Sequence, residues 1–216
     1  IRDAQESCGL GDVYKRQVQD PAAPACRLLR LAAPDDPDAA FFATVIGKSL
    51  AHGDLARSGL APDELDDVLA QRFPGARDGH DPALFDLPTR LAAYRVEGLA
   101  DPQPGFTLLL RVLLNAYGAP QCATTAWVTS VLAHACLRPD HLWRDLGLTG
   151  REDVTALLTR HYPGLVAHNT RNLRWKKFLA YSACEHAGLP AAAAPGCEAC
   201  DCLLYTSDAA DDTPCV

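Results

Sequence analysis

Helical spacing of the apolar residues limits most strongly what this chain can fold into. One stretch has its apolar residues at positions i, i+3, i+4 and i+8, namely Leu65, Val68, Leu69 and Phe73. This spacing places them on one face of an α-helix. Alternating β-branched and polar residues, which would indicate strands, hardly occur. The pattern therefore predicts an all-α fold, a multi-helix bundle of a size that suits one domain.

Proline and glycine mark where two of these helices begin and end. Pro37 is expected to begin a helix that Gly53 ends, because proline is favoured in the first turn and glycine after the last. A second helix is expected to begin at Pro62 and to stop at residues 74–75, which are Pro-Gly. Residues 75–88 are rich in Gly, Pro and Asp and are predicted to form a loop.

The second half of the chain has similar signals. Helices are predicted at residues 106–117, 124–136 and 171–187, the first of them strongly apolar and expected to be buried. Thr149 and Glu152 match the capping box S/T-x-x-E, which predicts the start of another helix.

Two segments resemble each other. GLAPDELDDVLAQRFPG, residues 59–75, is similar to GLTGREDVTALLTRHYPG, residues 147–164. Each follows a Leu-x-Arg tripeptide, Leu55 to Arg57 in one copy and Leu142 to Arg144 in the other. Either a helical unit has been duplicated, or two capped amphipathic helices that end in Pro-Gly look alike by chance.

Both ends of the chain have the character of foreign sequence. DVYKRQ near the start and CLLYTSDAAD near the end back-translate to nucleotide sequences whose inner parts are reverse complements. They match the two orientations of a transposon adapter used for sequencing libraries. We therefore expect residues 1–17 and 202–216 to be translated adapter, with natural tails as the alternative. The chain also lacks methionine, so we expect a fragment.

Nine cysteines stand in a chain without a recognisable secretory signal, and clustered cysteines in a reducing compartment more often bind metal than form disulfides. Cys197 and Cys200 form a C-x-x-C pair, which brings two thiolates to one metal centre. A structural zinc ion or an iron–sulfur cluster usually takes four ligands, so this pair would be half of a site. A redox dithiol is the rival interpretation, but its usual βαβ setting is not predicted here.

Other cysteines and the histidines are interpreted mainly as packing residues. Cys184 is the third candidate metal ligand if the chain folds back, although a small buried thiol is the favoured interpretation. Cys122 and Cys136 are expected in the core. Among the histidines, His134 is expected in the core, while three others are expected at the surface: His161, His168 and His186.

Cations precede the cysteine pair. In RNLRWKKFLAYSAC, residues 171–184, helical spacing would align Arg171, Arg174 and Lys177 on one face, with Lys176 nearby. They could compensate an anionic cluster or attract an oxyanion such as molybdate. A solvated face of an amphipathic helix is the simpler interpretation, and from the spacing alone we favour it.

Several classes of function are not favoured. The net charge of −7 does not favour nucleic acid as a partner, and no apolar run reaches the length of a membrane span. A Ser-His-Asp order, a phosphate-binding glycine loop and H-E-x-x-H are all absent from the sequence. We therefore expect neither a conventional hydrolase nor a nucleotide-dependent enzyme.

The run HLWRDLGL, residues 141–148, and the run RHYPGLVAHNTRNLRWKKFL, residues 160–179, resemble the NifQ family of nitrogen-fixation proteins. Residues 41–75 are similar as well, and the most specific part is N-x-x-N-x-x-W-K-K-F, residues 169–178. The resemblance implies a bacterial, cytoplasmic carrier with an iron–sulfur cluster that takes up molybdenum. It would pass molybdenum to the proteins that assemble the nitrogenase iron–molybdenum cofactor, and Trp175, Lys176 and Lys177 would contribute to cofactor binding.

The family's cysteine motif is C-x4-C-x2-C-x5-C, and Cys197 and Cys200 match its second and third positions. Its first and last positions fall on Ala192 and Thr206, the latter inside the expected adapter. We expect a NifQ-like helical domain over residues 18–190 and a partial cluster-binding loop over residues 191–201. The alternatives are a helical protein with a structural zinc site and a metal-free protein–protein adaptor.

Overall fold

The computed structural model describes residues 22–78, 81–118 and 122–195, and within these ranges every regular element is a helix. This confirms the predicted all-α fold. The elements, in chain order, are α1 (Ala23–Leu31), α2 (Ala39–His52), η1 (Leu55–Ser58), α3 (Pro62–Arg72), η2 (Pro82–Leu84), α4 (Leu87–Glu97), α5 (Pro104–Tyr117), α6 (Ala123–Ala135), α7 (Leu142–Leu146), α8 (Arg151–His161), α9 (Pro163–His168) and α10 (Trp175–His186).

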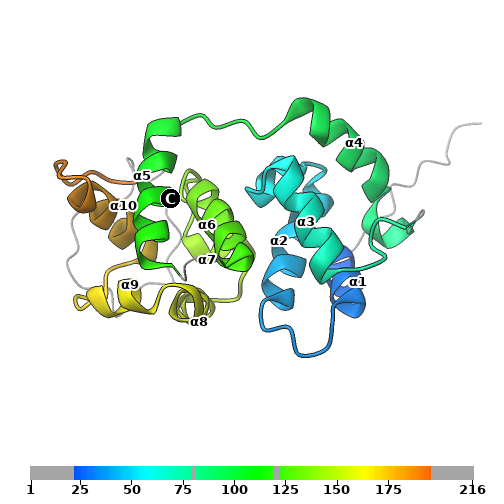
Figure 1. Ribbon diagram of the computed structural model, residues 1–216, viewed down its shortest axis with the longest axis horizontal. Coiled ribbons are helices and arrows are strands. Elements are labelled where there is room, and N and C mark those ends of the chain that lie inside the picture. The colour runs from blue at the N-terminus through cyan, green and yellow to red at the C-terminus, as the bar shows by residue number, and fades with distance from the viewer. Residues whose placement is uncertain (1–21, 79–80, 119–121, 196–216) are drawn as a thin grey trace, which may run out of the picture.

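The helices gather in two groups that share one core. Figure 1 shows α1 to α4 on one side and α5 to α10 on the other, with an extended connection from α4 to α5. The groups meet where Phe42 of α2 packs edge-on against Trp127 of α6, with ring centroids 6.2 Å apart. Because aromatic side chains bury large apolar areas, this contact helps to join the two groups.

Local signals placed α2 and α3 correctly. Gly53 follows α2 with a φ of 75°, the left-handed conformation that glycine adopts without strain. Pro62 begins α3, and the carboxylate of Glu64 accepts the N–H of Ala61 at 2.9 Å. This bond satisfies one of the N–H groups that the first turn of a helix leaves unpaired.

Three predictions about α4, α5 and α8 need correction. The predicted loop over residues 75–88 contains the turn η2 and the first residues of α4. The helix over residues 106–117 is amphipathic rather than buried, since Leu108 is 62% exposed. The hydroxyl of Thr149 donates to Asp153 instead of forming the capping box with Glu152. Gly150 therefore takes the N-cap position of α8.

The two similar sequence segments fold alike. A short helix, η1 or α7, precedes each segment. The segment then begins with a left-handed glycine, Gly59 (φ 75°) or Gly147 (φ 76°), and continues into a longer helix. These longer helices, α3 and α8, end on an aromatic residue of nearly equal conformation: Phe73 with φ −130° and ψ 61°, and Tyr162 with φ −139° and ψ 55°. The resemblance therefore extends to backbone conformation.

The two similar segments also make reciprocal contacts. A Cβ atom on Gly59 would lie 2.7 Å from the Cβ of His134 in α6, and one on Gly147 would lie 3.1 Å from Thr44 in α2. Each glycine thus lets its segment approach the helix that precedes the other segment. The cross-links are reciprocal too: Arg72 at the end of α3 donates to Thr124 at the start of α6, and Arg160 near the end of α8 donates to Asp38, the N-cap residue of α2.

No helix among the described residues has both the length and the apolar character needed to cross a membrane.

Candidate metal site

The C-x-x-C pair lies outside the described residues, which end at Pro195. The predicted metal loop formed by Cys197 and Cys200 therefore stays a prediction. The described chain does contain the approach to it, a coil after α10 in which Ala192 is exposed and Ala194 is buried. Figure 1 shows this coil turning back from α10 toward α5. The last described residues thus lie on the α5 and α10 side of the molecule.

Cys184 lies in the core of this region. Its side chain is free and 5% exposed within α10, and its backbone carbonyl accepts the N–H of Leu189 at 2.8 Å. A thiol in this position is largely shielded from a metal at the protein surface. In the ranges that the structure describes, no three His, Cys, Asp or Glu side chains form a group that could hold a metal ion.

The predicted cationic helix face does not form. α10 begins at Trp175, so Arg171 and Arg174 precede the helix instead of lying along it. The turn before α10 is held by Asn169, whose side-chain amide donates to the carbonyl of Leu173 and whose side-chain oxygen accepts the N–H of Leu173. The helical prediction from residue 171 was wrong because this local asparagine turn competes with the helix.

Lys176 is a structural cation. It is 4% exposed, and its ammonium donates to three oxygens, the carbonyls of Arg138 and Asp140 and the carboxylate of Asp145. An ammonium has three N–H donors, so all of them are used. Lys176 therefore fastens α10 to the segment around α7, and its contacts give no support to the expected role in binding cofactor.

Trp175 and Lys177 have different surroundings. The indole Nε1 of Trp175 donates to the hydroxyl of Thr155 at 3.0 Å, and its ring packs edge-on against Phe178. Trp175 is 6% exposed and packs α10 against α8. Lys177 is half-buried, and its ammonium lies 5.8 Å from the ring centroid of Tyr181. Of the three residues expected to contribute to cofactor binding, Lys177 is the one with a partly exposed side chain.

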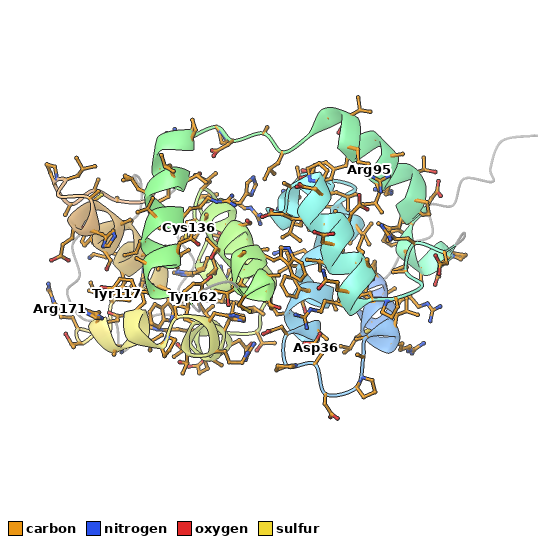
Figure 2. The ribbon with its side chains drawn as sticks, in the orientation of Figure 1. Asp36, Arg95, Tyr117, Cys136, Tyr162 and Arg171 are labelled. Carbon is orange, nitrogen blue, oxygen red and sulfur yellow. The ribbon has the colours of Figure 1, made fainter. Side chains whose placement is uncertain are left out.

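The sequence ahead of the cysteine segment (Cys197 to Cys200) is rich in cations. Between Asp153 and Glu185 the sequence has no acidic residue, but it has five cations: Arg160, Arg171, Arg174, Lys176 and Lys177. Arg171 is exposed, whereas Arg174 and Lys177 are half-buried. Arg160 and Lys176 are paired with Asp38 and Asp145, so Arg171, Arg174 and Lys177 are the cations of this stretch that would attract anions. Figure 2 shows Arg171 at the same end of the molecule as Tyr117.

A buried polar network, which the sequence interpretation missed, links the two helix groups. His161 was expected at the surface but is 6% exposed. Its Nε2 lies 3.2 Å from the carboxylate of Asp38, and its Nδ1 lies 3.1 Å from the hydroxyl of Thr125. Arg160 also donates to Asp38, at 2.8 Å. His161 and Asp38 are far apart in sequence, so helical spacing carries no signal for their contact.

Electrostatics at Asp38 follow from this geometry. Burial by itself raises the pKa of Asp38, because it disfavours the charged form. The hydrogen bonds and charges of His161 and Arg160 outweigh burial and hold the pKa of Asp38 below its usual value. The carboxylate is therefore ionised at neutral pH and stabilises the junction between α2 and α8.

Cys122 was expected in the core but is exposed. It is the N-cap residue of α6. Hydrogen bonds from the side chain and backbone of Thr125 lower the pKa of the Cys122 thiol, with a smaller contribution from Thr124. Cys136, by contrast, is 1% exposed, as predicted. The described part of the chain thus has two exposed thiols, Cys26 and Cys122, and two buried thiols, Cys136 and Cys184.

Comparisons with known proteins agree with the sequence resemblance. The family model of NifQ matches residues 41–204. The chain is 35% identical over 172 residues to the protein NifQ homolog of Sinorhizobium fredii, an alignment that covers 76% of this chain and 69% of that protein. No solved structure matches the chain.

Two further relatives carry the same name. The chain is 44% identical over 91 residues to protein NifQ of Azotobacter vinelandii and 39% identical over 75 residues to protein NifQ of Rhodobacter capsulatus. These alignments cover 42% and 35% of this chain and 47% and 42% of the relatives, so the chain spans less than half of each. The family match includes α3 to α10 together with the C-x-x-C pair, and the chain belongs to the NifQ family of nitrogen-fixation proteins.

Proposed function

We propose that this chain is an iron–sulfur and molybdenum carrier that supplies molybdenum for biosynthesis of the nitrogenase iron–molybdenum cofactor. The observation that carries the proposal is the C-x-x-C pair, Cys197 and Cys200, downstream of a cation-rich stretch in a NifQ-family chain. Its partners would be the cofactor-assembly proteins, and its cargo would be the metal cluster itself.

The donor chemistry supports this cargo. Thiolates are soft ligands that suit iron–sulfur centres, whereas magnesium or calcium would need oxygen ligands. In the described ranges no carboxylate or histidine group forms a rival metal centre. The proposal therefore assigns cargo binding to the cysteine segment and support of that segment to the helical domain.

The charge distribution supports an anionic cargo. A cluster held by thiolates is negatively charged, and molybdate is an oxyanion. Arg171 and Lys177 have exposed or partly exposed side chains in the acid-free region before the cysteine segment. Their charges would favour approach of either anion. Lys176 is not counted among them, because its ammonium is already bound to three oxygens.

We assign no turnover of an organic substrate to the chain. A carrier must bind its cargo and then release it to a partner, so its ligands need to be accessible. A cysteine segment that follows the last helix of the domain is suited to exchange its thiolates with those of a partner. The proposed activity is thus transfer of a metal cluster and not catalysis.

Anaerobic reconstitution tests the proposal. The 216-residue chain would be incubated with ferrous iron, sulfide and molybdate, desalted, and analysed for metals and by EPR. We expect bound iron and molybdenum with a cluster signal. A Cys197→Ser/Cys200→Ser variant should lose both metals, and a Cys26→Ser/Cys122→Ser variant, with the same number of thiols removed, should keep them.

The alternatives give different results in the same experiment. A structural zinc site would yield a colourless protein that retains zinc and no molybdenum. A metal-free adaptor would give no metal that depends on Cys197 and Cys200. Either result would refute the carrier proposal.

A further inference from the structure

Two half-buried cations tie the two helix groups together through backbone carbonyls. Lys48 of α2 donates to the carbonyl of Arg144 in α7. Arg138, which follows α6, donates to the carbonyl of Arg57 in η1. Arg57 and Arg144 are the equivalent residues of the two Leu-x-Arg tripeptides, so the two bonds are reciprocal. Figure 1 shows α2 and α6 on facing sides of the two groups, and the bonds bring positive charge from both groups to this junction.

The two equivalent arginines differ in what their guanidinium groups contact. The guanidinium of Arg144 lies over the ring of Trp143, 4.9 Å from its centroid, and 3.9 Å from the carboxylate of Asp140. In the part of the chain that the structure describes, the guanidinium of Arg57 forms no ion pair, and its Nε is buried without a hydrogen-bond partner. Buried donors of this kind are rare, because their loss of hydration is not compensated. Arg57 therefore has a donor available for a ligand.

The carboxylates around this junction are engaged elsewhere. Asp145 accepts a hydrogen bond from Lys176, and Asp140 lies beside the stacked arginine of α7. Asp54 accepts the N–H of Ala56 at 3.0 Å and so caps the start of η1. Among the described residues, no carboxylate forms an ion pair with any of three cations, which are Lys48, Arg57 and Arg138.

The charges of these three cations act on one another. Burial is the main cause that lowers the pKa of Lys48, and the charges of Arg138 and Arg57 lower it further while Asp145 opposes them. Burial also lowers the pKa of Arg138, and the charge of Arg57 adds to this effect. In both cases a neighbouring cation disfavours the charged form, and a bound anion would relieve that repulsion.

We propose that Lys48, Arg57 and Arg138 form a binding site for a small tetrahedral oxyanion at the junction of the two helix groups. A guanidinium offers a planar fork of donors that matches two oxygens of such an ion. The ammonium of Lys48 has three N–H groups and uses one of them on the carbonyl of Arg144. Each of the three residues is half-buried, so part of each stays open to solvent while burial strengthens the attraction.

Calorimetric titration tests the inference, which goes beyond the carrier function and does not involve the cysteine segment. The 216-residue chain, in chloride buffer at constant ionic strength, would be titrated separately with sulfate, phosphate and molybdate. Constant ionic strength distinguishes a site from general attraction, which salt screens. We expect saturable binding of one ion per chain in at least one titration, and the order of affinities identifies the preferred oxyanion. Absence of saturable binding in all three would overturn the inference.

Substitution of Arg57 locates the site. Arg57→Gln should weaken binding at least about tenfold, because a charge-assisted hydrogen bond is lost. The matched control is Arg144→Gln at the equivalent position, where the guanidinium already contacts Trp143. This control should stay within about threefold of the wild-type affinity. Unchanged affinity in Arg57→Gln, or equal losses in the two variants, would contradict the assigned site.

Thermal unfolding gives a second readout and shows whether the variants fold. Because a ligand that binds only the native state stabilises it, saturating oxyanion should raise the Tm of the wild type and of Arg144→Gln but not that of Arg57→Gln. If Arg57→Gln does not fold, Arg57→Lys replaces it in the comparison. That variant keeps the charge but loses the fork, so it should bind at least about threefold more weakly than the wild type. Wild-type affinity in Arg57→Lys would then contradict the inference.

The two proposals fail separately. The Cys197→Ser/Cys200→Ser variant should bind the oxyanion with wild-type affinity, and a loss of binding in it would contradict the location of the site. A wild type that binds a metal cluster but no oxyanion refutes only this inference. A wild type that binds the oxyanion but no cluster refutes only the carrier function.

Discussion

The ammonium of Lys176 and the carboxylate of Asp145 form an ion pair in which the two side chains are only 5% and 8% exposed. This pair joins α10 to α7, and the remaining N–H groups of Lys176 donate to backbone carbonyls of Arg138 and Asp140. Lys176, which belongs to the N-x-x-N-x-x-W-K-K-F pattern, thus holds α10 in place.

Replacing Lys176 with methionine should destabilise the fold strongly. The carboxylate of Asp145 would stay buried without its cation, and breaking a buried pair in this way typically costs about 3–5 kcal/mol. The free energy of unfolding, from urea titration, measures the change. Lys177→Met is the control. The side chain of Lys177 is half-buried, and its loss should lower the free energy of unfolding by less than about 1 kcal/mol. Equal losses in the two variants would show that the Lys176 pair is not structural.

Acid should weaken the junction around Asp38. The folded-state pKa of Asp38 lies below its unfolded value of roughly 4. Its ionised form therefore stabilises the fold above that value, and this stability is lost as pH falls through the folded pKa. The substitution Asp38→Asn should lower the free energy of unfolding by about 1–3 kcal/mol at pH 7.

The difference between wild type and Asp38→Asn is the quantity to follow, because other carboxylates titrate in both proteins. The free energies of unfolding of the two proteins, measured at intervals from pH 7 to pH 3, should begin to converge as the pH falls below about 4. A difference that stays constant over this range would contradict the assigned role of the His161 and Arg160 contacts.

Cys122 should ionise more readily than an ordinary thiol. Hydrogen bonds from Thr125 lower its pKa, so the pH midpoint of its alkylation should lie below the value of about 8.5 for free cysteine. Thr125→Val should move the midpoint upward. Iodoacetamide labelling followed by peptide mass spectrometry measures this, with the exposed Cys26 as an internal reference. A midpoint at or above the free value in the wild type would contradict the prediction.

A side chain at Gly59 should be poorly tolerated. Its φ is 75°, and an added Cβ would lie 2.7 Å from the Cβ of His134. Gly188→Ala provides a matched control, because Gly188 also has a positive φ, 68°, but nothing lies within 4 Å of an added Cβ. Gly59→Ala should therefore lower the free energy of unfolding by about 1–3 kcal/mol more than Gly188→Ala does. Similar melting temperatures for the two variants would contradict the close packing against α6.

Local signals predicted much of the helical fold. The residues around Pro62 and Gly53 define helix ends through their own backbone preferences, so α2 and α3 could be placed before any tertiary contact was known. The same reasoning failed at residue 171, where Asn169 bonds to Leu173 and forms a turn. Such a turn is also local, but it competes with helical spacing rather than adding to it.

The polar contacts could not be predicted in the same way. Lys176 and His161 were interpreted from their own helices, yet their carboxylate partners, Asp145 and Asp38, lie on other elements. Periodicity shows which face of a helix is apolar but does not show which distant residue meets a charge. The cysteine pair, although conspicuous in the sequence, lies outside the described residues and stays a prediction from its spacing and family.

Molybdenum donation tests the central claim most directly. The chain would be loaded anaerobically with iron, sulfide and isotopically enriched molybdate, desalted, and added as the sole molybdenum source to purified nitrogenase cofactor-assembly proteins. The carrier proposal predicts that the enriched isotope enters the cofactor and that the Cys197→Ser/Cys200→Ser variant donates none. Incorporation no greater than with an equal amount of free molybdate would contradict it.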